Sequence, residues 1–78
     1  MYPNPARSSV NIALAEPAMN RVDVVVYTYN ATVMRTFSFA PGGSLLGFDV
    51  SSLPVGQYII QVRETGKSVQ SLRLVRNE

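Results

Sequence analysis

The feature of this sequence that most restricts its fold is a series of short apolar runs with a period of two, each ended by turn-forming residues. Val10, Ile12 and Leu14 alternate with Asn11 and Ala13, and the run stops at Glu16-Pro17. Turn signals recur at roughly the 8–12-residue spacing that is typical of a β-sandwich. No stretch shows the uninterrupted three- and four-residue apolar spacing of an amphipathic helix. The sequence therefore predicts an all-β fold.

These runs predict six strands, and a seventh short strand is expected around residues 2–6. The run around Val24 and Val25 is apolar on both faces, as a central strand would be. Asn30-Ala31 is interpreted as a tight hairpin connection in which Asn30 takes the left-handed conformation. Short loops favour antiparallel pairing of consecutive strands. The six clear strands are expected over residues 10–14, 22–27, 32–39, 46–50, 57–63 and 68–76.

Length and composition fit one domain covering residues 1–78, a single immunoglobulin-like antiparallel β-sandwich of about seven strands. A chain of this size hides only about 60% of the surface that it exposes when unfolded. Such a chain needs a well-packed apolar core to be stable. Its composition allows one, because 46% of the residues are hydrophobic while 15% are charged. There is no cysteine, so neither a disulfide nor a Cys-ligated metal site is available.

The charges argue against a nucleic-acid partner. The chain has seven Lys and Arg residues and five Asp and Glu residues. The cations are scattered along the sequence, with only Arg73 and Arg76 close together. A protein that follows phosphates concentrates positive charge on one face. No apolar run approaches the ~20 residues that span a bilayer. The opening residues 1–9 lack the apolar segment of a signal peptide.

The chemistry-bearing residues predict that the chain is not an enzyme and needs no cofactor. Histidine and cysteine are both absent, which removes the usual base, the thiol nucleophile and the commonest zinc ligands. Asp23 and Asp49 could together contribute to a calcium site. The interpretation that we favour is that Asp49 ends a strand and caps the turn at Ser51-Ser52.

Two further motifs have a functional and a structural interpretation. Tyr27, Tyr29 and Tyr58 could form an aromatic platform for sugars, but such tyrosines are more often half-buried strand residues with a solvated hydroxyl, which is the interpretation favoured here. Gly42-Gly43 is followed by neither a helix nor a Lys-Ser/Thr pair, so it is a turn and not a phosphate loop.

Four segments of the chain stand out as a set. They are the opening Tyr2-Pro3-Asn4-Pro5-Ala6, the apolar block at residues 24–27, the segment Asp49 to Tyr58 and the closing Leu72-Arg73-Leu74-Val75-Arg76. In order and at family spacing, they resemble the motifs of the type A C-terminal sorting domains of the Bacteroidetes type IX secretion system. Those motifs are a YPNPA start, an apolar second block, D-x-S-x-L-P-x-G-x-Y and a closing K-L-V-K. In this chain Arg stands in place of both Lys residues of the last motif, and Ala31 stands where the family has glycine.

The resemblance implies a non-catalytic signal that directs a cargo protein fused at its N-terminal side. The cargo, often a glycoside hydrolase, peptidase or adhesin, would reach the periplasm by its own signal peptide. The secretion machinery and outer-membrane components would then carry it outward, to be secreted or held at the cell surface. Because Met1 directly precedes the opening motif, we expect the chain to be excised from a larger protein. The implied family-motif positions are Tyr2, Pro3, Asn4, Pro5, Asp49, Leu53, Pro54, Gly56 and Tyr58.

The closing strand is the expected docking element. If it lies at a sheet edge, its amides and carbonyls can pair with a partner strand, and its side chains can supply selectivity. We therefore predict that the secretion machinery recognises Leu72, Arg73, Leu74, Val75 and Arg76. The same edge would also allow self-association between copies. The corner at residues 54–58 is expected to serve the fold.

The alternative function is a carbohydrate-binding or fibronectin-like accessory module of a secreted hydrolase. Such a module would need a flat exposed aromatic row, and the chain has no tryptophan to anchor one. A structural spacer is a third option, which would occur in tandem inside its parent protein.

Overall fold

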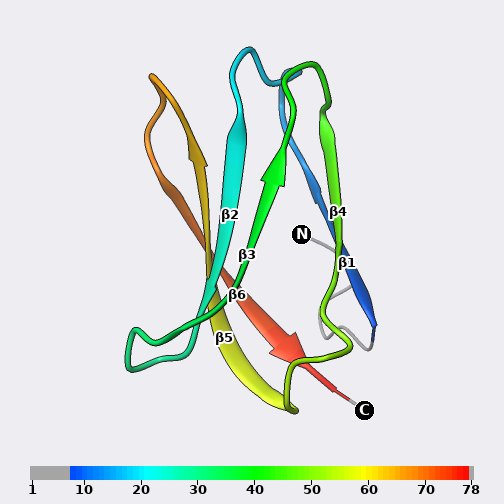
Figure 1. Cartoon of the computed structure of the whole chain (residues 1–78), viewed down its shortest axis with the longest axis vertical. Coiled ribbons are helices and arrows are strands. Elements are labelled where there is room, and N and C mark those ends of the chain that lie inside the picture. The colour runs from blue at the N-terminus through cyan, green and yellow to red at the C-terminus, as the bar shows by residue number, and fades with distance from the viewer. Residues whose placement is uncertain (1–7, 78) are drawn as a thin grey trace.

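The computed structural model describes residues 8–77 and shows a two-layer β-sandwich (Figure 1). Within that range there are six strands and no helix, which confirms the all-β prediction. The seventh strand expected at residues 2–6 and the motif positions Tyr2, Pro3, Asn4 and Pro5 lie outside the described residues. The strands are β1 (Ser9–Ala13), β2 (Val22–Tyr27), β3 (Val33–Phe39), β4 (Leu45–Asp49), β5 (Gly56–Glu64) and β6 (Gln70–Arg76).

One layer is a four-stranded sheet in the order β3-β2-β5-β6, and the other is the pair β1-β4 (Figure 1). All four strand pairings are antiparallel. Of the consecutive strands, only β2 with β3 and β5 with β6 are hydrogen-bonded neighbours. The other connections cross from one layer to the other, as in a sandwich with Greek-key-like connections. Among the strands of the described range, β2 is central, as predicted, and β6 is an edge strand.

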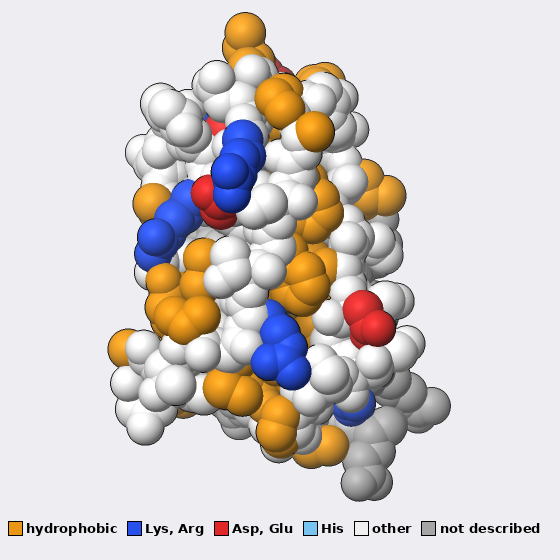
Figure 2. Space-filling model, in the orientation of Figure 1, with side chains coloured by type: hydrophobic (Ala, Val, Ile, Leu, Met, Phe, Trp, Pro, Cys, Tyr) orange, Lys and Arg blue, Asp and Glu red, His pale blue; other side chains and the backbone are white. Residues whose placement is uncertain are grey.

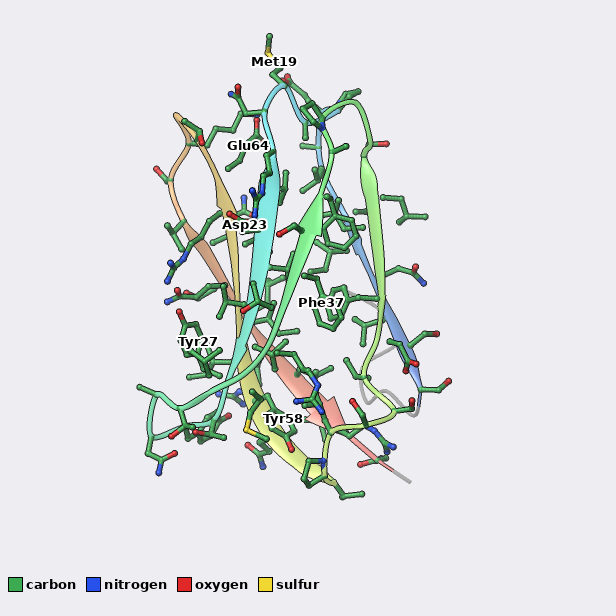
Figure 3. The ribbon with its side chains drawn as sticks, in the orientation of Figure 1. Met19, Asp23, Tyr27, Phe37, Tyr58 and Glu64 are labelled. Atoms are coloured by element: carbon green, nitrogen blue, oxygen red, sulfur yellow. The ribbon has the colours of Figure 1, made fainter. Side chains whose placement is uncertain are left out.

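The core lies between the two layers and follows the alternation of the sequence. Val24 and Val26 of β2, Ile60 of β5 and Leu74 of β6 are fully buried on the inner face of the larger sheet. The β1-β4 pair covers them with side chains that include Val10 and Leu46. Figure 3 shows Phe37 in the space between the sheets, where its ring centroid lies 4.8 Å from that of Phe48. Apolar burial on this scale is what holds a disulfide-free domain of this size together.

The β2–β3 hairpin differs from its prediction. Ala31, and not Asn30, has the positive φ, at 67°. The loop is three residues long: the Ala31 amide donates to the Thr28 carbonyl at 3.0 Å, and the Thr28 amide donates to the Thr32 carbonyl at 2.9 Å. In a loop of this length a type I turn is followed by one left-handed residue, so the strained position is the third and not the second.

Candidate functional site

The predicted docking residues occupy both faces of the edge strand β6. Leu74 is fully buried and Leu72 packs against the core, so these two leucines belong to the inner face. Arg73 and Val75 alternate with them and lie on the outer face of the sheet, where Arg73 pairs in register with Ile59 of β5. The five residues therefore do not form one surface: the outer side chains and the strand edge are presented outward, while the leucines anchor the strand.

Arg76 is directed into the fold by hydrogen bonds to the loop after β4. Its Nε donates to the Val50 carbonyl and its Nη2 donates to the Ser51 carbonyl, each at 3.1 Å. Its Nη1 donates to the neighbouring Asn77 carbonyl. The planar guanidinium suits this arrangement because its donors form a fixed fork that reaches two acceptors at once. Arg76 thereby fastens the end of β6 to the opposite layer.

The loop that receives Arg76 is the start of the D-x-S-x-L-P-x-G-x-Y segment. Asp49 accepts a hydrogen bond from the Ser51 amide at 2.8 Å, as the capping interpretation predicted. This bond, with smaller contributions that include the nearby positive charge of Arg76, lowers the pKa of the Asp49 carboxyl below its usual 3.8. The turn closes with the Leu53 amide donating to the Val50 carbonyl at 3.0 Å. Leu53 is buried against the core.

The same segment continues into a corner held by Tyr58. The Tyr58 ring is buried, and its hydroxyl donates to the Pro54 carbonyl at 2.5 Å. A tyrosine that bonds back to the backbone a few residues upstream is a known device of immunoglobulin-like folds, the tyrosine corner. Gly56 lies between them at φ 159°, a value that side-chain-bearing residues rarely adopt. These contacts explain the spacing of Leu53, Pro54, Gly56 and Tyr58 in the motif.

Two motif blocks that are separated in the sequence thus form one structural unit. The Asp49–Tyr58 segment makes the loop and corner, and Arg76 of the closing segment binds that loop. Sequence reasoning placed Arg76 in the docking set and missed this inward role. The signal was present in the alternation, since Leu72, Leu74 and Arg76 occupy the same face of a strand.

Asp23 makes its hydrogen bond and its ion pair with side chains that lie next to it in the fold. Asp23 accepts from the Ser38 hydroxyl at 2.8 Å and pairs with Arg21 at 3.0 Å. The Ser38 hydrogen bond is the main cause of the lowered pKa of the Asp23 carboxyl. Asp23 lies in the four-stranded sheet and Asp49 in the two-stranded one, and each carboxylate accepts a hydrogen bond from a serine near it. Residues 8–77 contain no group of three or more His, Cys, Asp or Glu side chains placed to hold a metal ion.

The three tyrosines do not form one platform. Tyr58 lies in the core, while Tyr27 points away from it on the outer face of the larger sheet (Figure 3). Tyr29 comes from the β2–β3 loop and donates its hydroxyl to Gln57 Oε1 at 3.0 Å. Tyr27 and Tyr29 are therefore outer-face residues with bonded hydroxyls, and a row of three aromatic rings is wrong.

The cations do not form a continuous patch on the face drawn in Figure 2. The Lys and Arg side chains in the upper part of that view flank an acidic side chain, and those lower down stand apart from them. Over the range that the structure describes, no helix has both the length and the apolar character required to cross a bilayer.

Residues 8–77 thus form a helix-free β-sandwich in which two of the motif segments join one sheet edge to one corner. The chain matches the family model of the secretion system C-terminal sorting domain over residues 1–76, and it belongs to that family. No curated protein and no solved structure matches the chain. The resemblance noted in the sequence is thus confirmed.

Membership fixes the function at the level of the family. These domains are non-catalytic sorting signals that are recognised by the type IX secretion machinery. They direct proteins to the cell surface or into the medium.

Proposed function

We propose that this chain is itself a non-catalytic signal, which sorts a cargo fused to its N-terminal side and is bound by the type IX machinery along β6. The cargo, a secreted glycoside hydrolase, peptidase or adhesin, crosses the periplasm first and then the outer membrane. The observation that carries the proposal is that the closing family motif lies on an edge strand of the larger sheet. Among residues 8–77, β6 pairs with β5 alone, which places it at the edge of that sheet.

The fold supports strand addition as the mode of binding. Leu74 and Arg76 hold β6 in place from the inner side, so its outer edge is preorganised before a partner arrives. A preorganised strand loses little conformational entropy on binding. Main-chain hydrogen bonds supply affinity in this mode, while alternate side chains supply specificity.

Export of a reporter tests the proposal. The 78-residue chain is fused after a fluorescent protein that carries a signal peptide, in a bacterium with a type IX system. We expect the reporter outside the cell with the full chain, and in the periplasm when the chain stops at Ser71. Because the truncation also removes the core side chain Leu74, Leu74→Ala serves as a second variant. It weakens the core by about 2–5 kcal/mol yet keeps the strand.

Three results decide the matter. Periplasmic retention of the truncated fusion, with at least partial export of Leu74→Ala, supports recognition of β6. Normal export of the truncated fusion contradicts it. Failure of the intact chain to export the reporter contradicts the sorting function itself.

A further inference from the structure

The loop after β4 receives hydrogen bonds from a second arginine besides Arg76. Arg35 of β3 donates to the Ser52 hydroxyl through both Nε and Nη2, at 3.3 and 3.1 Å. Its Nη1 donates to the Met34 carbonyl at 2.7 Å, which fixes the guanidinium beside its own strand. Ser52 directly follows the two residues whose carbonyls accept from Arg76. Three consecutive loop residues are therefore bonded to two arginines.

The two arginines come from opposite sides of the larger sheet. Within the described range β3 and β6 are its outermost strands, with β2 and β5 between them, so they lie three inter-strand spacings or roughly 14 Å apart. Arg35 pairs in register with Val26, which is fully buried, so the Arg35 side chain leaves β3 on the face that is turned to the other layer. The loop at residues 50–52 thus joins both sides of the sheet at the end of the sandwich where β6 terminates (Figure 1).

Buried residues anchor the two ends of this loop, and the two serines between them are exposed. Val50 and Leu53 lie in the core. The Leu53 amide donates to the Val50 carbonyl, so the turn is closed by its own backbone. Within the described chain, the hydrogen bonds that join residues 50–52 to the larger sheet come from Arg35 and Arg76. The position of the loop relative to that sheet therefore depends on both arginines.

We propose that Arg35 is a positioning residue for the sorting signal. By holding Ser52 to β3, it keeps the loop where Arg76 reaches both of its carbonyl acceptors, and the end of β6 is then presented to the machinery in one conformation. The ends of edge strands open at little cost in free energy, so one further hydrogen-bonded contact changes the fraction of molecules in which the strand end is in place. This inference rests on the proposed function and adds a residue on the opposite outermost strand that sets how β6 is held.

Exchange of the Arg76 Nε proton with solvent reports this coupling, because that proton is donated to the Val50 carbonyl. It is measured by NMR in the isotopically labelled 78-residue chain. In Arg35→Ala and in Ser52→Ala the proton should exchange roughly threefold to tenfold faster, the change expected for the loss of one hydrogen bond. The double variant should exchange no faster than either single variant, because both remove the same bond. Unchanged exchange in both single variants, or additive effects in the double variant, overturns the proposal.

Arg21→Ala is the matched control for Arg35→Ala. Arg21 is also an exposed arginine, and it also donates to a serine hydroxyl, that of Ser38 at 2.9 Å. Because its bond to Ser38 lies on the outer face of the sheet, the Arg76 proton should exchange as in the wild-type chain. Thermal melts verify that each variant keeps the fold. Acceleration by Arg21→Ala equal to that by Arg35→Ala would indicate a general loss of stability and contradict positioning by Arg35.

The export assay separates this inference from the proposed function. We expect Arg35→Ala and Ser52→Ala each to reduce export of the reporter by roughly twofold to fivefold, and Arg35→Lys to restore part of it, since an ammonium still donates to the Ser52 hydroxyl. If both alanine variants are exported as well as wild type, positioning by Arg35 is wrong while sorting by this chain stands. If the wild-type fusion stays in the periplasm, the proposed function is wrong, and the exchange data alone decide whether Arg35 holds the loop.

Discussion

At the scale of single residues, Ala31 is the clearest conflict between side chain and backbone. Its φ of 67° lies in the left-handed region, which costs a residue with a Cβ about 1–2 kcal/mol. The surrounding hairpin imposes this conformation, because Thr28 binds Ala31 and Thr32 across the loop. The resemblance to the family placed a glycine here, and the loop geometry explains why glycine suits the position.

Ala31→Gly should therefore stabilise the domain. We expect the free energy of unfolding to rise by roughly 1 kcal/mol, since relief of the left-handed strain exceeds the added freedom of the unfolded chain. Urea unfolding followed by circular dichroism measures the change.

Asn30→Gly is the matched control for that substitution. Asn30 does not have a positive φ, and its Oδ1 accepts from the Thr28 hydroxyl at 2.5 Å. Glycine there should lower stability. If Asn30→Gly stabilises and Ala31→Gly does not, the assignment of the left-handed position is wrong.

At the scale of elements, β6 is joined to the rest of the molecule by its register with β5, by Leu74 and by Arg76. The register pairs Tyr58 with Leu74 and Gly56 with Arg76. The corner and the closing strand therefore support each other directly. A change in either element alters how the edge of β6 is presented.

Removal of the Arg76 side chain should weaken the attachment of β6 to the loop after β4. Arg76→Ala should lower the free energy of unfolding by roughly 1–2 kcal/mol, because two carbonyls lose a charged donor at a partly exposed site. Arg76→Lys should recover part of the loss, since a single ammonium does not reproduce the fork. Chemical unfolding of the purified variants provides the measurement.

Ser71→Ala is the control for this contact, because Ser71 lies on the same strand but is exposed on the outer face. Its effect should stay within about 0.5 kcal/mol, as is usual for exposed positions. A larger loss for Ser71→Ala than for Arg76→Ala would contradict the inward role of Arg76.

Several elements could be predicted from the sequence for a simple reason. In β5 the alternation of Tyr58, Ile60 and Val62 with a mostly polar set predicts which side faces the core, and the structure confirms it. The pairing of β1 with β4 could not be predicted, because it joins segments that are distant in the chain and no local pattern encodes it. The alternation indicates the face on which Arg76 lies, but its partners Val50 and Ser51 depend on that same layer arrangement, so the contact itself required the structure.

At the scale of the whole molecule, the larger sheet has two edges that differ in chemistry. The β6 edge carries the closing motif, while the β3 edge ends in the strained hairpin. The alternation and the turn signals of the sequence predict a β-sandwich, and its residue types predict no catalytic site. The sorting role came from the resemblance, because a signal that is read by its surface has no catalytic residue pattern to detect.

Site-specific photo-crosslinking in cells tests most directly whether the machinery binds the β6 edge. A photoreactive residue replaces Ser71 on β6 in one fusion and Thr36 on β3 in another, both exposed positions on opposite edges of the same sheet. We predict an adduct with a protein of the secretion machinery from position 71 and none from position 36. Adducts from position 36 that equal or exceed those from position 71 would contradict recognition through β6.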